Sequence, residues 1–156
     1  MSNYKYKYYP KRPVKSFQDL EVYQKTLGLG VEIVKKVRNT SKESKHTLEV
    51  QSKITDKLVK TVLSIPKLIA SAHSVRFGDS ERAIADLEKA MLNCNLAVYY
   101  LELFRDLVNP VPAEVGIDHE YFEEQIKEYL RVRGKIMRLQ RSWLRFIPLE
   151  KPRRKT

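Results

Sequence analysis

The side chains of this chain with the clearest capacity for binding chemistry are the arginines and lysines near its C-terminal end. Residues 131–156 contain ten Lys or Arg and a single acid, Glu150. Arginine presents a planar fork of N–H donors that matches phosphate oxygens, and it also stacks on nucleobases. The segment therefore predicts polyanion binding through Arg131, Arg133, Lys135, Arg138, Arg141, Arg145, Lys151, Arg153, Arg154 and Lys155.

The spacing of these charges predicts a ridge on one side of a helix. Arg131, Arg138 and Arg145 are seven residues apart, and Lys135 falls in the gap between the first two. A favourable contact with the helix dipole is a simpler explanation, but it contributes about 0.3–1 kcal/mol and reaches only the last turn. A basic stretch of several turns favours contact with a polyanion, and a merely solvated face is the alternative.

The N-terminal segment 1–15 repeats the basic chemistry in a different form. It has no acid and no apolar period, and it interleaves Tyr4, Tyr6, Tyr8 and Tyr9 with Lys5, Lys7, Lys11 and Arg12. Tyrosine rings can stack on unpaired bases while neighbouring cations follow the phosphate backbone. We interpret it as a flexible second contact, with a tail without function as the alternative.

Catalytic and metal-binding patterns are absent from the sequence. His46, His73 and His119 are far apart and show no metal-ligand spacing, and Cys94 is the only cysteine. Cys94 lies among helical apolar residues, which favours a small buried side chain over a reactive thiol. Gly28 and Gly30 lie within a helical pattern, where close helix packing is favoured over a phosphate loop. We therefore expect no enzyme activity and no cofactor.

Four helices must position these residues. Apolar periodicity and turn signals predict helices over 16–39, 47–75, 80–108 and 118–146, with Ser16 as the first N-cap. In the first helix the predicted core stripe is Phe17, Leu20, Tyr23, Leu27, Val31 and Val34. Long amphipathic helices with short loops predict an all-α fold, an antiparallel four-helix bundle over 16–147 flanked by a basic arm (1–15) and a basic tail (148–156).

The net charge of +11 is concentrated at the two ends, because the stretch 16–130 carries more acids than bases. Such clustering is typical of proteins with a polyanionic partner. No run of about 18 apolar residues is present and the N-terminus lacks the apolar part of a secretory signal. We expect a cytoplasmic protein without membrane contact, and the membrane-surface helix remains as a minor alternative.

Several segments resemble a bacterial superfamily of four-helix bundles. SFQDLEVYQKT (16–26), LSIPKLIASAHS (63–74) and DSERAIADLEKA (79–90) resemble the proteins encoded in rRNA intervening sequences. KHTLEVQSKI (45–54), YLELFRDL (100–107) and RGKIMRLQRSWL (133–144) look closer to a second branch, the accessory variability determinants of diversity-generating retroelements. The first branch has an Asn-Ile-Ala-Glu-Gly run where this chain has Leu68, Ser71 and Ala72 in the Asn, Glu and Gly places, which favours the second.

The resemblance to the second branch implies a homopentameric barrel that binds a reverse transcriptase and its template RNA or the RNA–cDNA hybrid, and so supports mutagenic reverse transcription. Two alternatives remain: an rRNA-binding bundle of the first branch, and a helical scaffold that binds only proteins.

Overall fold

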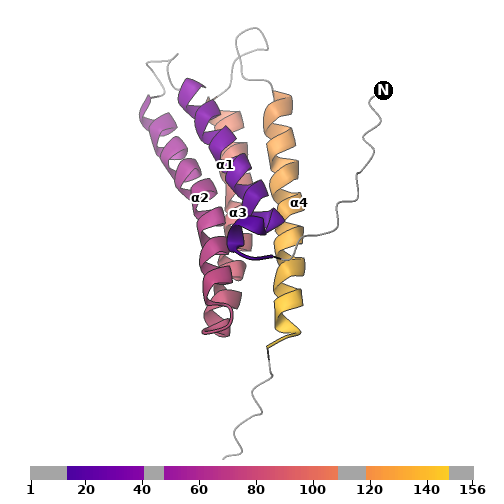
Figure 1. The fold of residues 1–156 in the computed structure, drawn as a ribbon. Helices are drawn as coiled ribbons and strands as arrows, with labels where there is room; N and C mark the ends of the chain where they lie inside the picture. Colours follow the sequence, from indigo (N-terminus) through magenta and orange to yellow (C-terminus); the bar gives the residue numbers. More distant parts are fainter. Residues whose placement is uncertain (1–13, 41–47, 109–118, 148–156) are drawn as a thin grey trace, which may run out of the picture.

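The computed structural model describes residues 14–40, 48–108 and 119–147. Within them the chain forms four long helices and no strand, which confirms the predicted all-helical four-helix bundle (Figure 1). A short 3-10 helix, η1 (Phe17–Asp19), precedes α1 (Glu21–Thr40), α2 (Leu48–Val75), α3 (Ser80–Val108) and α4 (His119–Leu144). The predicted helix ends are correct to within two residues except at the start of the first helix.

The prediction that Ser16 is an N-cap is confirmed, but the predicted start of the first α-helix near Ser16 is wrong, since α1 begins at Glu21. Ser16 caps η1 instead: its hydroxyl accepts from the Gln18 N–H, and the Asp19 carboxylate accepts from the Ser16 N–H. Both hydrogen bonds of this capping box are present, and they satisfy backbone N–H groups of the single turn η1. Leu20 then adopts an extended conformation, with φ −72° and ψ 125°, and buries its side chain before α1 begins.

The four helices form a ring in which the backbone of each lies close to two others. α1 packs against α2 and α4, and α3 also packs against α2 and α4, whereas the described backbones of α2 and α4 do not come close to one another. The packing is most extensive between α2 and α3 and least extensive between α1 and α4. Fully buried apolar side chains from all four helices fill the centre, among them Ile33, Leu58, Val62, Ile65, Ile69, Leu87, Leu101, Phe104, Phe122, Tyr129 and Ile136.

The predicted core stripe of the first helix is confirmed in part. Leu20 is buried, and Phe17, Tyr23 and Val34 pack against the core. Leu27 and Val31 are wrong, since they are 40% and 39% exposed, and the buried positions of α1 are Val22, Thr26, Leu29, Ile33 and Val37. Thr26 explains the error, because an apolar pattern treats threonine as a surface residue. Here its hydroxyl donates to the Val22 carbonyl oxygen at 2.7 Å, which satisfies the polar group inside the core.

Gly30 sets the distance between α1 and α2. A Cβ at this position would lie 3.3 Å from the carbonyl oxygen of Val62, whereas a Cβ at Gly28 would meet nothing within 4 Å. Val62 is four residues before Pro66, which lies inside α2 and has no N–H to donate to that carbonyl. Close packing, predicted for both glycines, is therefore confirmed at Gly30 and wrong at Gly28.

Hydroxyl and amide groups tie the outer edges of the helices together. Ser71 donates to Asp86 at 2.9 Å, and Asn93 donates to the Ser64 hydroxyl at 2.7 Å, both between α2 and α3. Gln140 of α4 donates to Glu88 of α3 at 3.0 Å. These bonds fix how far neighbouring helices are displaced along their axes. They therefore also fix where the basic half of α4 lies relative to α3.

Candidate nucleic-acid interface

The basic half of α4 presents a row of arginines to solvent. Arg131, Arg138 and Arg145 are all exposed, because their seven-residue spacing keeps them on one side of the helix. Tyr129, about half a turn away, and Val132, about a third of a turn away, are buried in the core. From residue 131 to residue 147 the helix and its end contain no acidic residue. The position of the charge on this face thus follows from which side of α4 the core buries.

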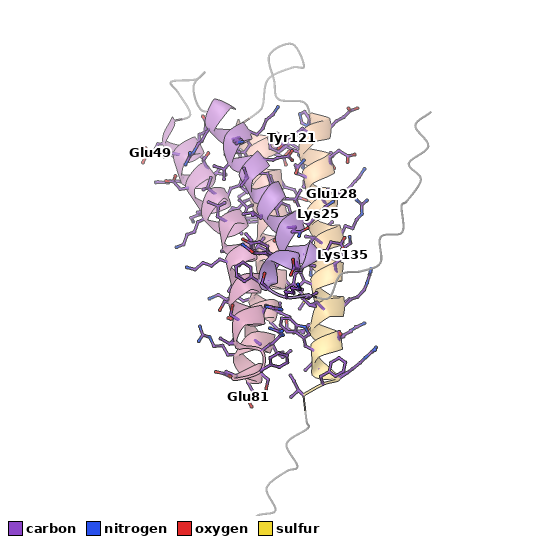
Figure 2. The ribbon with its side chains drawn as sticks, viewed as in Figure 1. Lys25, Glu49, Glu81, Tyr121, Glu128 and Lys135 are labelled. Atoms are coloured by element: carbon purple, nitrogen blue, oxygen red, sulfur yellow. The ribbon has the colours of Figure 1, made fainter. Side chains whose placement is uncertain are left out.

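Two of the six predicted α4 cations have carboxylate partners. Arg131 forms an ion pair with Glu128, whose other oxygen lies 3.0 Å from the Lys25 Nζ on α1. Lys135 forms an ion pair with Glu21 at the start of α1. Figure 2 shows Lys25, Glu128 and Lys135 along the seam between α1 and α4. The pKa of Glu128 is lowered, chiefly by the hydrogen bond from Lys25, so this carboxylate stays charged.

Arg133 lies on a different side of α4 from the row. It is half-buried, and its Nε is buried without a hydrogen-bond partner among the described residues. Its charge acts on the buried thiol of Cys94, where it opposes burial, yet burial still raises the pKa of Cys94 to about 12. Arg133 and Arg141 line a groove of about 400 Å³ between α3 and α4, together with Glu88 and Leu92. Arg133 therefore contributes to the α3–α4 packing more than to the outer face.

Arg138, Arg141 and Arg145 have no acidic partner within the described part of the chain, and all three are exposed. An unpaired guanidinium keeps all its N–H donors available to an anion. The structure thus divides the six predicted α4 residues into two paired, one half-buried and three unpaired. The other predicted contacts, Lys5, Lys7, Lys11, Arg12, Lys151, Arg153, Arg154 and Lys155, lie outside the described residues.

A second row of cations, on α2, was not predicted from the sequence. Lys53, Lys57, Lys60 and Lys67 are exposed, and Lys53 lies 3.4 Å from the Glu49 carboxylate. The excess of acids over the whole stretch 16–130 hid this row, although its spacing of four, three and seven residues is a helical signal. α2 and α4 are opposite one another in the ring, so the two rows lie on opposite sides of the bundle.

Other kinds of site find little support in the described residues. No three His, Cys, Asp or Glu side chains there are grouped so that they could hold a metal ion. None of the described helices combines the length and the apolar character needed to cross a bilayer. No protein-family model, curated protein or solved structure matches this chain.

Proposed function

We propose that this protein binds nucleic acid without catalysing a reaction, and that the outward face of α4 contacts the phosphate backbone. The observation that carries the proposal is that the exposed Arg138, Arg141 and Arg145 have no acidic partner among the described residues and lie on a helical half without acids. They differ in this from Arg131, which pairs with Glu128 of the same helix. These three guanidinium groups are well suited to phosphate oxygens.

The resemblance of residues 45–54, 100–107 and 133–144 to the retroelement accessory proteins supports a more specific role. In that role the bundle binds a reverse transcriptase together with its template RNA or RNA–cDNA hybrid, and mutagenic cDNA synthesis depends on the complex. An rRNA-binding bundle would use the same phosphate contacts. A reverse-transcriptase gene beside the coding sequence supports the first role, and a location inside an rRNA operon supports the second.

The test of nucleic-acid binding is the salt dependence of the affinity for a fluorescein-labelled structured RNA, measured by anisotropy. Contacts with phosphates release counterions, so the logarithm of the binding constant falls by about 0.7–0.9 per neutralised phosphate for each log unit of salt. We expect a steep, linear dependence. No binding at low salt, or binding with a flat dependence, would instead support the scaffold that binds only proteins.

Self-association of the chain is part of the proposal, and an apolar stripe on α3 supports it. Leu92, Leu96, Tyr99 and Leu107 recur at helical spacing on the outer side of α3, and Leu103, which also packs against the core, lies among them. Leu92, Tyr99 and Leu107 are each more than half exposed. A helix with apolar residues on all sides is typically buried on all sides. The stripe thus suits contact with other copies, and the resemblance suggests a pentameric barrel.

Sedimentation velocity of two variants tests the stripe. Leu92→Glu places a charge in the stripe and should shift the protein to monomer. Val50→Glu on α2 is the matched control, because Val50 is 57% exposed and Leu92 is 55% exposed. A monomeric wild-type protein, or equal effects of the two variants, would remove the α3 stripe as the contact surface.

A further inference from the structure

The end of the bundle where α2 turns into α3 carries two strongly exposed aromatic rings. Phe77 in the turn is 88% exposed and Phe146, just after α4, is 82% exposed, the highest values among large apolar side chains of the described residues. Both line a cavity of about 450 Å³ together with the half-buried Trp143. This end is the lower end of the bundle in Figure 1. Large apolar side chains that are exposed together are a common feature of contact surfaces.

A guanidinium group holds one of these rings in place. The Arg76 Cζ lies 4.2 Å from the centroid of the Phe77 ring, a cation–π contact that covers one face of the ring. The Arg76 Nη1 also donates to the backbone carbonyl of His73 in the last turn of α2. His73 in turn packs near Trp143, with 6.2 Å between ring centroids. The far face of Phe77 remains open, next to a fixed positive charge.

We propose that this aromatic end binds the unpaired bases of a single-stranded nucleic acid by stacking them on Phe77 and Phe146. The inference rests on the proposed function and adds the ligand class, single strand rather than duplex. Arginines and exposed rings together suit a ligand that combines an anionic backbone with π-faced bases. The rings are continuous with the phosphate-binding row, because Arg145 directly precedes Phe146.

The acidic residues at this end do not make it negatively charged, so they do not repel an anionic ligand. Asp79 precedes α3 and its carboxylate accepts from the backbone N–H of Arg82 at 3.1 Å, so the helix N-terminus holds it. Glu81 is exposed in the first turn of α3. Arg76, Arg82 and Arg145 outnumber these two acids, which leaves the end with a net positive charge.

The test compares two ligands of equal charge, one with bases and one without. The probes are a fluorescein-labelled oligo-dT of about twelve nucleotides, within the size range of single-strand sites, and an abasic oligonucleotide of the same length. We expect the wild-type protein to bind oligo-dT at least about fivefold more tightly, since each stacked base contributes appreciably to affinity. We also expect oligo-dT to quench the emission of Trp143, the only tryptophan of the chain.

Three variants separate stacking from apolar contact. Phe77→Leu keeps the apolar character but removes the ring, and it should abolish most of the preference for oligo-dT while leaving the salt dependence unchanged. Phe77→Tyr keeps the ring and should keep the preference. Val50→Ala, an exposed apolar position near the other end of α2, should behave as wild type. Because Phe77 is so exposed, its replacement should leave the fold intact.

The outcomes distinguish the inference from the proposed function. If both oligonucleotides bind with equal affinity, the aromatic end does not stack bases, although the phosphate contacts stand. If neither oligonucleotide binds while the structured RNA does, the inference fails and the proposed function stands; if the structured RNA does not bind either, the proposed function itself fails. If Trp143 emission changes with protein concentration alone and Phe77→Leu abolishes that change, the aromatic end contacts a second copy and the inference is overturned.

Discussion

Two pairs of cations on α4 allow a matched test of how this helix meets phosphate. Arg138 and Arg145 have no acidic partner in the described part of the chain, whereas Arg131 and Lys135 face Glu128 and Glu21. The double variants Arg138→Gln/Arg145→Gln and Arg131→Gln/Lys135→Gln remove the same formal charge from the same helix. A difference between them therefore reports position and pairing rather than net charge.

The expected magnitude follows from the pairing. If Arg138 and Arg145 each neutralise a phosphate, their loss flattens the log-log salt slope by about 1.4 for single strands and about 1.8 for duplex. Glu21 offsets the charge of Lys135, and Glu128, which also pairs with Lys25, engages the Arg131 guanidinium, even though an exposed ion pair itself contributes only about 0–1 kcal/mol. The loss of the paired cations should therefore flatten the slope by less than about 0.7.

The assay is the anisotropy titration of labelled RNA at several salt concentrations, with circular dichroism to show that both variants are folded. Equal changes in slope would mean that the ligand responds to the total charge of the protein and not to an ordered row. An unchanged slope in the folded Arg138→Gln/Arg145→Gln variant would remove the outward face of α4 from the interface.

Three further predictions concern the fold. Gly28→Ala should raise the free energy of unfolding by about 1 kcal/mol, the usual gain at an open helix position. Gly30→Ala should stabilise the protein less or destabilise it, because the new Cβ would lie 3.3 Å from the Val62 carbonyl oxygen. Equal gains of the two variants in urea unfolding would refute this. Burial lowers the pKa of His73 below its ordinary 6.5, so on acidification the unfolded chain binds a proton at a higher pH than the folded chain. The free energy of unfolding should therefore fall as the pH drops below 6.5. His73→Gln should lose less stability over this range, and an identical loss of stability would exclude His73 as the cause. Cys94, buried with its pKa raised to about 12, should resist a disulfide-forming thiol reagent at neutral pH until urea unfolds the protein, and rapid labelling of the native state would show that the thiol is accessible.

The helices could be predicted from the sequence because their signals are local. The apolar period of α2 continues past Pro66, and so does the helix. The basic half of α4 and the seven-residue spacing of its arginines are likewise plain in the order of the residues. The pairing of Arg131 with Glu128 is also predictable, because residues three positions apart are neighbours on a helix surface.

Where α1 begins and which of its residues are buried could be learned only from the tertiary structure. Ser16 looks like a helix cap from sequence, but whether its turn continues into a helix depends on where Leu20 finds the core. Thr26 looks like a surface residue, yet it is buried because its hydroxyl finds a carbonyl oxygen within its own helix. Close approach at Gly30 depends on the facing carbonyl of Val62 on another helix.

The binding face combines both kinds of information. The sequence by itself determined that α4 ends in a long basic stretch, because composition and helical period are properties of the segment alone. Only the tertiary structure decided which of those cations are unpaired, since the partner of Lys135 is Glu21, which lies 114 residues earlier in the chain. The same holds for Phe77 and Phe146, which come from distant turns and line one cavity only because α2 turns into α3 beside the end of α4.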